Sequence, residues 1–140
     1  MGKIRVVLAD DHQQTIARVR QTLGEEFEVV GAVEDGKQAV SAVVTLNPDV
    51  LIIDISMPVL NGLHAAKQLQ TTDCRAKVIF LTIYEGRDFL DAAFSAGASA
   101  YVNKARLSTD LIPAIHEAML GRIFISAPQL MQCDRPPACA

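Results

Sequence analysis

The feature that most constrains the fold of this 140-residue chain is a fivefold alternation of short β-type runs with segments of helical periodicity. Strands are expected at residues 4–8, 29–33, 50–53, 77–81 and 100–102. Helices are expected at residues 13–23, 37–46 and 63–69, around 89–94 with Gly97 as terminator, and from near 109 to about 120. The last helix tolerates Pro113 only because it is expected near the first turn. Such alternation favours an α/β fold, with a parallel sheet covered by helices on both faces.

The third expected strand, residues 50–53, is the most informative. Its four residues are all apolar, with no polar alternation, which is typical of a strand buried on both faces. Asp54 follows directly and therefore lies at the carboxyl end of the strand. In open α/β sheets ligands collect at these ends, so this carboxylate is a candidate functional group.

Other strand ends also carry polar residues: Asp10 and Asp11 after the first, Thr82 after the fourth and Lys104 after the fifth. The carboxyl ends of parallel strands meet at one edge of the sheet, so we expect these side chains to converge on Asp54. Three clustered carboxylates repel each other unless a cation lies among them, and one lysine is too little to balance them. The pattern therefore predicts a site for Mg²⁺ and an anionic oxygen ligand, with Thr82 as hydroxyl donor.

Each residue also has an ordinary structural interpretation. Asp11 is suited to cap the first helix, Thr82 to cap the following turn, and Lys104 to lie in solvent. The joint placement of complementary groups at four independent strand ends argues against coincidence.

Four separated motifs, VVLADDH, LIIDISMPVLNGL, VIFLT and GASAYVNKA, resemble the receiver domain of two-component response regulators over about residues 3–121. The resemblance implies a flavodoxin-like, doubly wound fold with a five-stranded parallel sheet of order 2-1-3-4-5 and five helices. It also implies that Asp54 accepts a phosphoryl group from the phosphohistidine of a sensor histidine kinase. Residues 1–127 would form this receiver domain, and the Pro-rich segment 128–140 is expected to be disordered.

The resemblance assigns a role to each motif residue. Asp11 and Asp54 would bind Mg²⁺ directly with the backbone carbonyl of Ser56, while Asp10 would act mainly through a water molecule. Phosphoryl transfer asks a protein chiefly for positioning and charge neutralisation, which suits this set.

The same resemblance gives three residues a part in reading the phosphoryl group. Lys104 would pair with it, Thr82 would move to hydrogen-bond it, and Tyr101 would turn inward as Thr82 moves. Tyr101 also has the simpler interpretation of a half-buried strand aromatic.

The chain departs from the family pattern after the lysine. Ala105 stands where the family commonly has a proline linked by a cis peptide, and a cis bond to a non-proline residue costs about 2.5–4 kcal/mol. Either packing offsets that energy or the loop is trans. Ser56 and Tyr84 occupy positions that help set the phosphoryl lifetime in the family, and the bulk of Tyr84 suggests a slow loss.

The motifs ADDH and GRIFISAPQLM resemble the NarL/FixJ type of receiver, which normally continues into a LuxR-type helix-turn-helix output domain. We expect no output domain in this chain, and so no binding of nucleic acid by the chain itself. It is interpreted either as the receiver part of a transcription regulator or as a stand-alone receiver acting through protein–protein contacts. A homodimer through the first and last helices, or through the face of the fourth helix, is expected.

Composition agrees with a soluble cytoplasmic domain. The net charge of −3 gives no electrostatic footprint for nucleic acid or anionic membrane, and no apolar run approaches the roughly 20 residues of a membrane helix. Three cysteines without a C-x-x-C pair indicate neither a disulfide framework nor a zinc site. The histidines, which are His12, His64 and His116, are expected to be structural or solvent-facing.

Two other classes fit less well. An aspartyl-phosphate phosphohydrolase of haloacid-dehalogenase type needs a second aspartate two residues after the nucleophile, where this chain has Ser56. A flavin or nucleotide binder is disfavoured because both glycine-rich phosphate motifs are missing. We therefore expect a switch that catalyses only its own phosphorylation and dephosphorylation.

Overall fold

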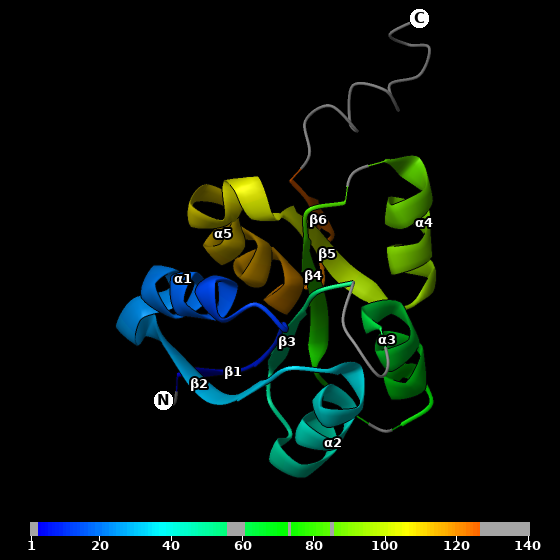
Figure 1. Cartoon of the computed structure of the whole chain (residues 1–140), viewed down its shortest axis with the longest axis horizontal. Helices are drawn as coiled ribbons and strands as arrows, with labels where there is room; N and C mark the ends of the chain where they lie inside the picture. Colours follow the sequence, from blue (N-terminus) through cyan, green and yellow to red (C-terminus); the bar gives the residue numbers. More distant parts are fainter. Residues whose placement is uncertain (1–2, 56–60, 73, 85, 127–140) are drawn as a thin grey trace, which may run out of the picture.

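The computed structural model describes residues 3–55, 61–72, 74–84 and 86–126. In this part of the chain a parallel sheet has the strand order β2-β1-β3-β4-β5-β6 (Figure 1). The strands are β1 (Ile4–Ala9), β2 (Phe27–Val33), β3 (Val50–Ile53), β4 (Lys77–Thr82), β5 (Ala98–Asn103) and β6 (Phe124–Ile125). The predicted order 2-1-3-4-5 is confirmed. The prediction of five strands is wrong, because a sixth strand, β6, pairs with the outer edge of β5.

Five α-helices cover the two faces of this sheet, within the described residues. They are α1 (Gln13–Leu23), α2 (Gly36–Leu46), α3 (Gly62–Gln70), α4 (Arg87–Ser95) and α5 (Leu107–Met119). Helices α1 and α5 pack on one face, and α2, α3 and α4 pack on the other (Figure 1). Each layer has its own apolar cluster, as expected for a doubly wound fold.

Strand β3 is buried on both faces, as its sequence predicts. Leu51 and Ile53 belong to the core under α2, α3 and α4, whereas Val50 and Ile52 belong to the core under α1 and α5. Because alternate residues of a strand point to opposite faces, an unbroken apolar run is what this position requires.

The backbone around Asp54 is fixed from two sides. Its N–H donates to the carbonyl of Ala9 at 3.0 Å, which ties the end of β3 to the end of β1. The start of α3 approaches so closely that a Cβ on Gly62 would overlap the carbonyl oxygen of Asp54. Only glycine fits here, so α3 packs directly on the backbone that carries the carboxylate.

Two boundaries differ from expectation near the end of the chain. Helix α5 begins at Leu107 instead of near residue 109, so Pro113 lies inside the helix and not near its first turn. The proline nitrogen carries no hydrogen, so the carbonyl of Thr109 receives no intrahelical bond from it. The surrounding residues Leu111, Ala114 and Ile115 are fully buried, and this packing holds the helix together.

Strand β6 follows α5 after a turn at Gly121, whose φ is 79°. The chain then runs beside β5, with Phe124 opposite Ala100 and Ile125 opposite Tyr101. Segment 128–140, expected to be disordered, lies outside the described residues. None of the helices that the structure describes is long and apolar enough to span a membrane.

Candidate functional site

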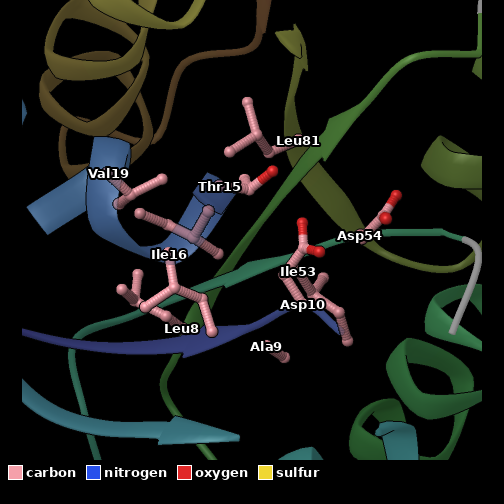
Figure 2. Close-up of a pocket in the computed structure, with 10 residues that line it drawn as sticks. Leu8, Ala9, Asp10, Thr15, Ile16, Val19, Ile53, Asp54 and Leu81 are labelled. Atoms are coloured by element: carbon pink, nitrogen blue, oxygen red, sulfur yellow. The ribbon is translucent and has the colours of Figure 1, made fainter. Parts of the chain in front are cut away.

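The carboxyl edge of the sheet brings most of the predicted site residues together. Asp10 follows β1 and Asp54 follows β3, and their carboxylates lie on the same side of the strand ends (Figure 2). Both residues are only 4% exposed. Asp11 lies beside them and is exposed. Adjacent parallel strands thus bring Asp54 into one cluster with two acids that lie more than 40 positions earlier in the chain.

Lys104 is the cation of this cluster. It follows β5, and its Nζ lies 2.9 Å from Asp10 Oδ2 and 3.1 Å from Asp54 Oδ2. Its side chain is 11% exposed, so the alternative interpretation of Lys104 as an ordinary solvent-exposed lysine is wrong. Burial alone lowers the pKa of the ammonium, but Asp10 and Asp54 outweigh it, and the pKa of Lys104 is raised above its usual value.

One oxygen of the cluster lacks a directed partner among the described residues. Asp10 Oδ2 is buried and accepts no hydrogen bond of suitable geometry, although Lys104 lies close enough for an ion pair. The other oxygen, Asp10 Oδ1, accepts from the N–H of His12 at 2.8 Å. A buried carboxylate oxygen without a directed donor suits a site that takes a cation.

His12 belongs to the cluster while keeping the solvent-facing position expected of it, since its side chain is 65% exposed. Its Nδ1 lies 3.1 Å from Asp10 Oδ1 and 3.1 Å from Asp11 Oδ1. It also stands at the N-cap position of α1, so Asp11 is not the cap that the structural interpretation suggested. The position of His12 directly after Asp10 and Asp11 is the sequence signal from which this contact could have been predicted.

The acidic groups are close enough to share one metal ion. Asp10, Asp11, His12 and Asp54 each offer one ligand atom, and these atoms lie within 4.8 Å of one another. Three carboxylates against one lysine leave an excess of negative charge, and oxygen-rich sets of this kind suit a hard divalent cation. Ser56, whose carbonyl was expected to complete the set, lies outside the described residues.

Thr82 and Tyr101 both contact the backbone of Tyr84. Thr82 is fully buried at the end of β4, and its Oγ1 accepts from the N–H of Tyr84 at 3.2 Å. Tyr101 is 1% exposed, and its hydroxyl donates to the carbonyl of Tyr84 at 2.9 Å. The hydroxyl of Thr82 therefore caps the turn that follows β4, as its ordinary structural interpretation predicted. The side chain of Tyr101 lies inside the protein without a phosphoryl group on Asp54.

A hollow of about 250 Å³ opens next to Asp54. It is lined by His12, Gln14, Thr15, Asp54, Ile83, Tyr84 and Lys104. The nucleophilic candidate and the lysine thus face an open space and not a packed core. Such a hollow gives a phosphoryl donor access to the carboxylate.

The loop after Lys104 is trans, since the described residues contain no cis peptide bond. Lys104 to Arg106 form a short 3₁₀ turn, and Asn103 Oδ1 accepts from the N–H of Ala105 at 2.8 Å. The side chain of Asn103 thereby fixes the backbone around the lysine without a proline.

Residues 6–116 match the family model described as the response regulator receiver domain. The chain belongs to this family. The resemblance found in the four separated motifs is thereby confirmed, and the matched range includes the whole acidic cluster together with Thr82, Tyr101 and Lys104.

Among curated relatives, the transcriptional regulatory protein DegU of Brevibacillus brevis is 37% identical over 126 residues, covering 89% of this chain and 53% of the relative. The transcriptional regulatory protein DesR of Bacillus subtilis strain 168 is 37% identical over 131 residues, covering 92% and 64%. The chain thus spans less than two thirds of the length of these relatives.

A solved structure of a LuxR-family two-component response regulator from Aurantimonas sp. SI85-9A1 superposes with a TM-score of 0.86. It is 28% identical, and the match covers 94% of each chain. Together with the relatives, this similarity confirms the expected NarL/FixJ (LuxR-type) subfamily.

Proposed function

We propose that this receiver accepts a phosphoryl group on Asp54 from the phosphohistidine of a sensor histidine kinase. The observation that carries the proposal is the position of Asp54, which is buried among acids, contacted by Lys104 and open to a hollow on one side. In the reaction the phosphorus–nitrogen bond of the donor breaks and a phosphorus–oxygen bond to Asp54 forms. The leaving imidazole keeps its electron pair and takes up a proton.

The chain's own residues supply orientation and charge. Lys104 holds the carboxylate of Asp54 in place and is positioned to neutralise charge on the transferred oxygens. Bound Mg²⁺, held by Asp11, Asp54 and the carbonyl of Ser56 with Asp10 acting through water, would neutralise further charge on those oxygens. The fit of the donor set supports this assignment.

The same residues supply a switch. A phosphoryl group on Asp54 offers new acceptor oxygens to Lys104 and to Thr82, whose hydroxyl now contacts the N–H of Tyr84. Because Tyr101 holds the carbonyl of Tyr84, a movement of Thr82 changes the surroundings of Tyr101 as well. Contacts made only in the modified state are what bias a two-state element. In this proposal the protein catalyses only its own phosphorylation and dephosphorylation.

In the full-length protein we propose that the switch controls transcription in the cytoplasm, with residues 1–127 as the receiver unit. The matched relatives are transcriptional regulatory proteins by name, and one structural relative, RcsB, is described as dimers bound to DNA. We propose a homodimer for this protein too, with DNA contacted only through an output domain.

The test is incubation with acetyl phosphate and Mg²⁺ followed by intact mass. The wild type is expected to gain one phosphoryl group and Asp54→Asn none. Asp110→Asn is a matched control, because Asp110 is a buried aspartate on α5 that pairs with Arg106. Labelling that survives Asp54→Asn would place the acceptor elsewhere.

A further inference from the structure

The segment after α5 is bonded to the end of β5 through Ser126. This residue is 4% exposed, and its Oγ accepts from the N–H of Asn103 at 2.7 Å in a buried contact. Its own N–H donates to the carbonyl of Tyr101 at 2.9 Å. Ser126 therefore continues the β5–β6 ladder by one step, with a side-chain hydroxyl as the acceptor where regular strand pairing uses a carbonyl.

This contact leads directly to the lysine of the site. The N–H of Asn103 donates to the hydroxyl oxygen of Ser126, and the side chain of Asn103 accepts from the N–H of Ala105. The backbone on both sides of Lys104 is thus fixed by one residue, and that residue is held by Ser126. From this backbone Lys104 reaches Asp10 and Asp54.

The same segment also touches the aromatic residue of the switch. Ile125 pairs with Tyr101 in the sheet and packs against the core that contains it. Thr82 lies opposite Asn103 in the β4–β5 pairing. Ser126 is therefore hydrogen-bonded to β5 at Tyr101 and at Asn103, the residue before Lys104. Tyr101 and Lys104 are two of the residues that would respond to a phosphoryl group.

We propose that Ser126 is a positioning residue for phosphorylation of Asp54, acting through Asn103 on Lys104, and that phosphorylation in return alters the Ser126–Asn103 contact. The proposal rests on the proposed function. A role limited to satisfying a buried N–H would affect stability but not the rate at saturating phosphoryl donor. Coupling between the two sites is reciprocal, so it shows in both directions.

The variants Ser126→Thr and Ser126→Val separate these roles, because the two side chains have the same shape and only threonine keeps the hydroxyl. With acetyl phosphate and Mg²⁺, Ser126→Val is expected to lower the maximal rate of Asp54 labelling by about fivefold, the factor for one net hydrogen bond. The KM for acetyl phosphate should stay within about twofold. Ser126→Thr should restore the rate, and Ser108→Ala, at an exposed serine of α5, should have no effect.

A second measurement needs no variant. Amide exchange of Asn103 is followed in the wild type before and after phosphorylation, and we expect its rate to change on phosphorylation. Equal labelling rates for Ser126→Val and Ser126→Thr, or an Asn103 exchange rate that does not respond to phosphorylation, overturn this proposal while leaving Asp54 as acceptor. A wild type that takes up no phosphoryl group overturns the proposed function, and this proposal with it.

Discussion

Lys104 Nζ lies 3.1 Å from Asp54 Oδ2, although 50 positions separate the two residues in the chain. The same ammonium is 2.9 Å from Asp10 Oδ2, so one lysine compensates two buried carboxylates. Removing one partner of a buried ion pair leaves charge without compensation, which is more costly than the pair is favourable.

We therefore expect Lys104→Met to lower the free energy of unfolding by about 3 kcal/mol when divalent cations are chelated. Added Mg²⁺ should recover part of this loss, because the cation replaces the missing charge. Urea unfolding with EDTA and with Mg²⁺ measures both effects. Lys37→Met, at an exposed lysine of α2, is the control, and equal stability of the two variants would contradict the prediction.

The stabilisation by Lys104 should fall at alkaline pH. The carboxylates outweigh burial and raise the pKa of Lys104 in the folded protein. A raised pKa gives stability that is complete below the unfolded-state value of about 10.4 and is lost as pH rises through the folded-state pKa. The difference in unfolding free energy between wild type and Lys104→Met should stay constant from about pH 7 to 9 and shrink above about 10.4. Other alkaline groups titrate in both proteins and cancel; a difference that already declines by pH 9 would refute this.

Much of the fold and site was predictable because strong local signals agreed with one global arrangement. The apolar run of β3 required burial on both faces, and parallel strands then forced Asp10, Asp54 and Lys104 to one edge. Their convergence follows from topology alone and needed no knowledge of side-chain contacts.

The remaining features depend on tertiary contacts that have no periodic signal. Strand β6 has two residues, too few to show a period. It forms because Ser126 exchanges hydrogen bonds with the backbone of β5 at Tyr101 and Asn103. The orientation of His12 toward two acids follows from the local turn before α1. The early start of α5 around Pro113 reflects burial of its apolar face, which overrides the proline signal.

Mg²⁺ should stabilise the wild type by mass action. At ten times the dissociation constant, binding to the folded state alone adds about 1.4 kcal/mol, and the thermal midpoint should rise by several degrees. Asp11→Asn removes a proposed ligand and should abolish most of the rise. Asp88→Asn, at an exposed aspartate of α4, should keep it. A Mg²⁺-dependent rise that is equal in both variants would show that Asp11 does not hold the ion.

Gly62→Ala should disturb the site from the backbone side. The added Cβ overlaps the carbonyl of Asp54, and neither the end of β3 nor the start of α3 yields without cost. We expect a loss of about 1–3 kcal/mol in unfolding free energy and slower labelling of Asp54. Gly31→Ala is the matched control on β2, because its Cβ would meet side chains and no backbone: Leu46 at 3.1 Å and Val7 at an ordinary contact distance of 3.9 Å. Wild-type labelling and stability in Gly62→Ala would show that this close approach is not needed.

Tyr84→Ala should shorten the lifetime of the phosphoryl group. Tyr84 lines the hollow beside Asp54, and its ring stacks on Phe89 with centroids 4.5 Å apart, so the ring is held where it limits access of water. Removing the ring opens the hollow, and hydrolysis of the acyl phosphate should accelerate severalfold. Tyr84→Phe keeps both the bulk and the stacking and should retain the wild-type lifetime. The lifetimes are measured by loss of the phosphoryl group in intact mass after the donor is removed. Equal decay of Tyr84→Ala and wild type would show that this side chain does not shield the site.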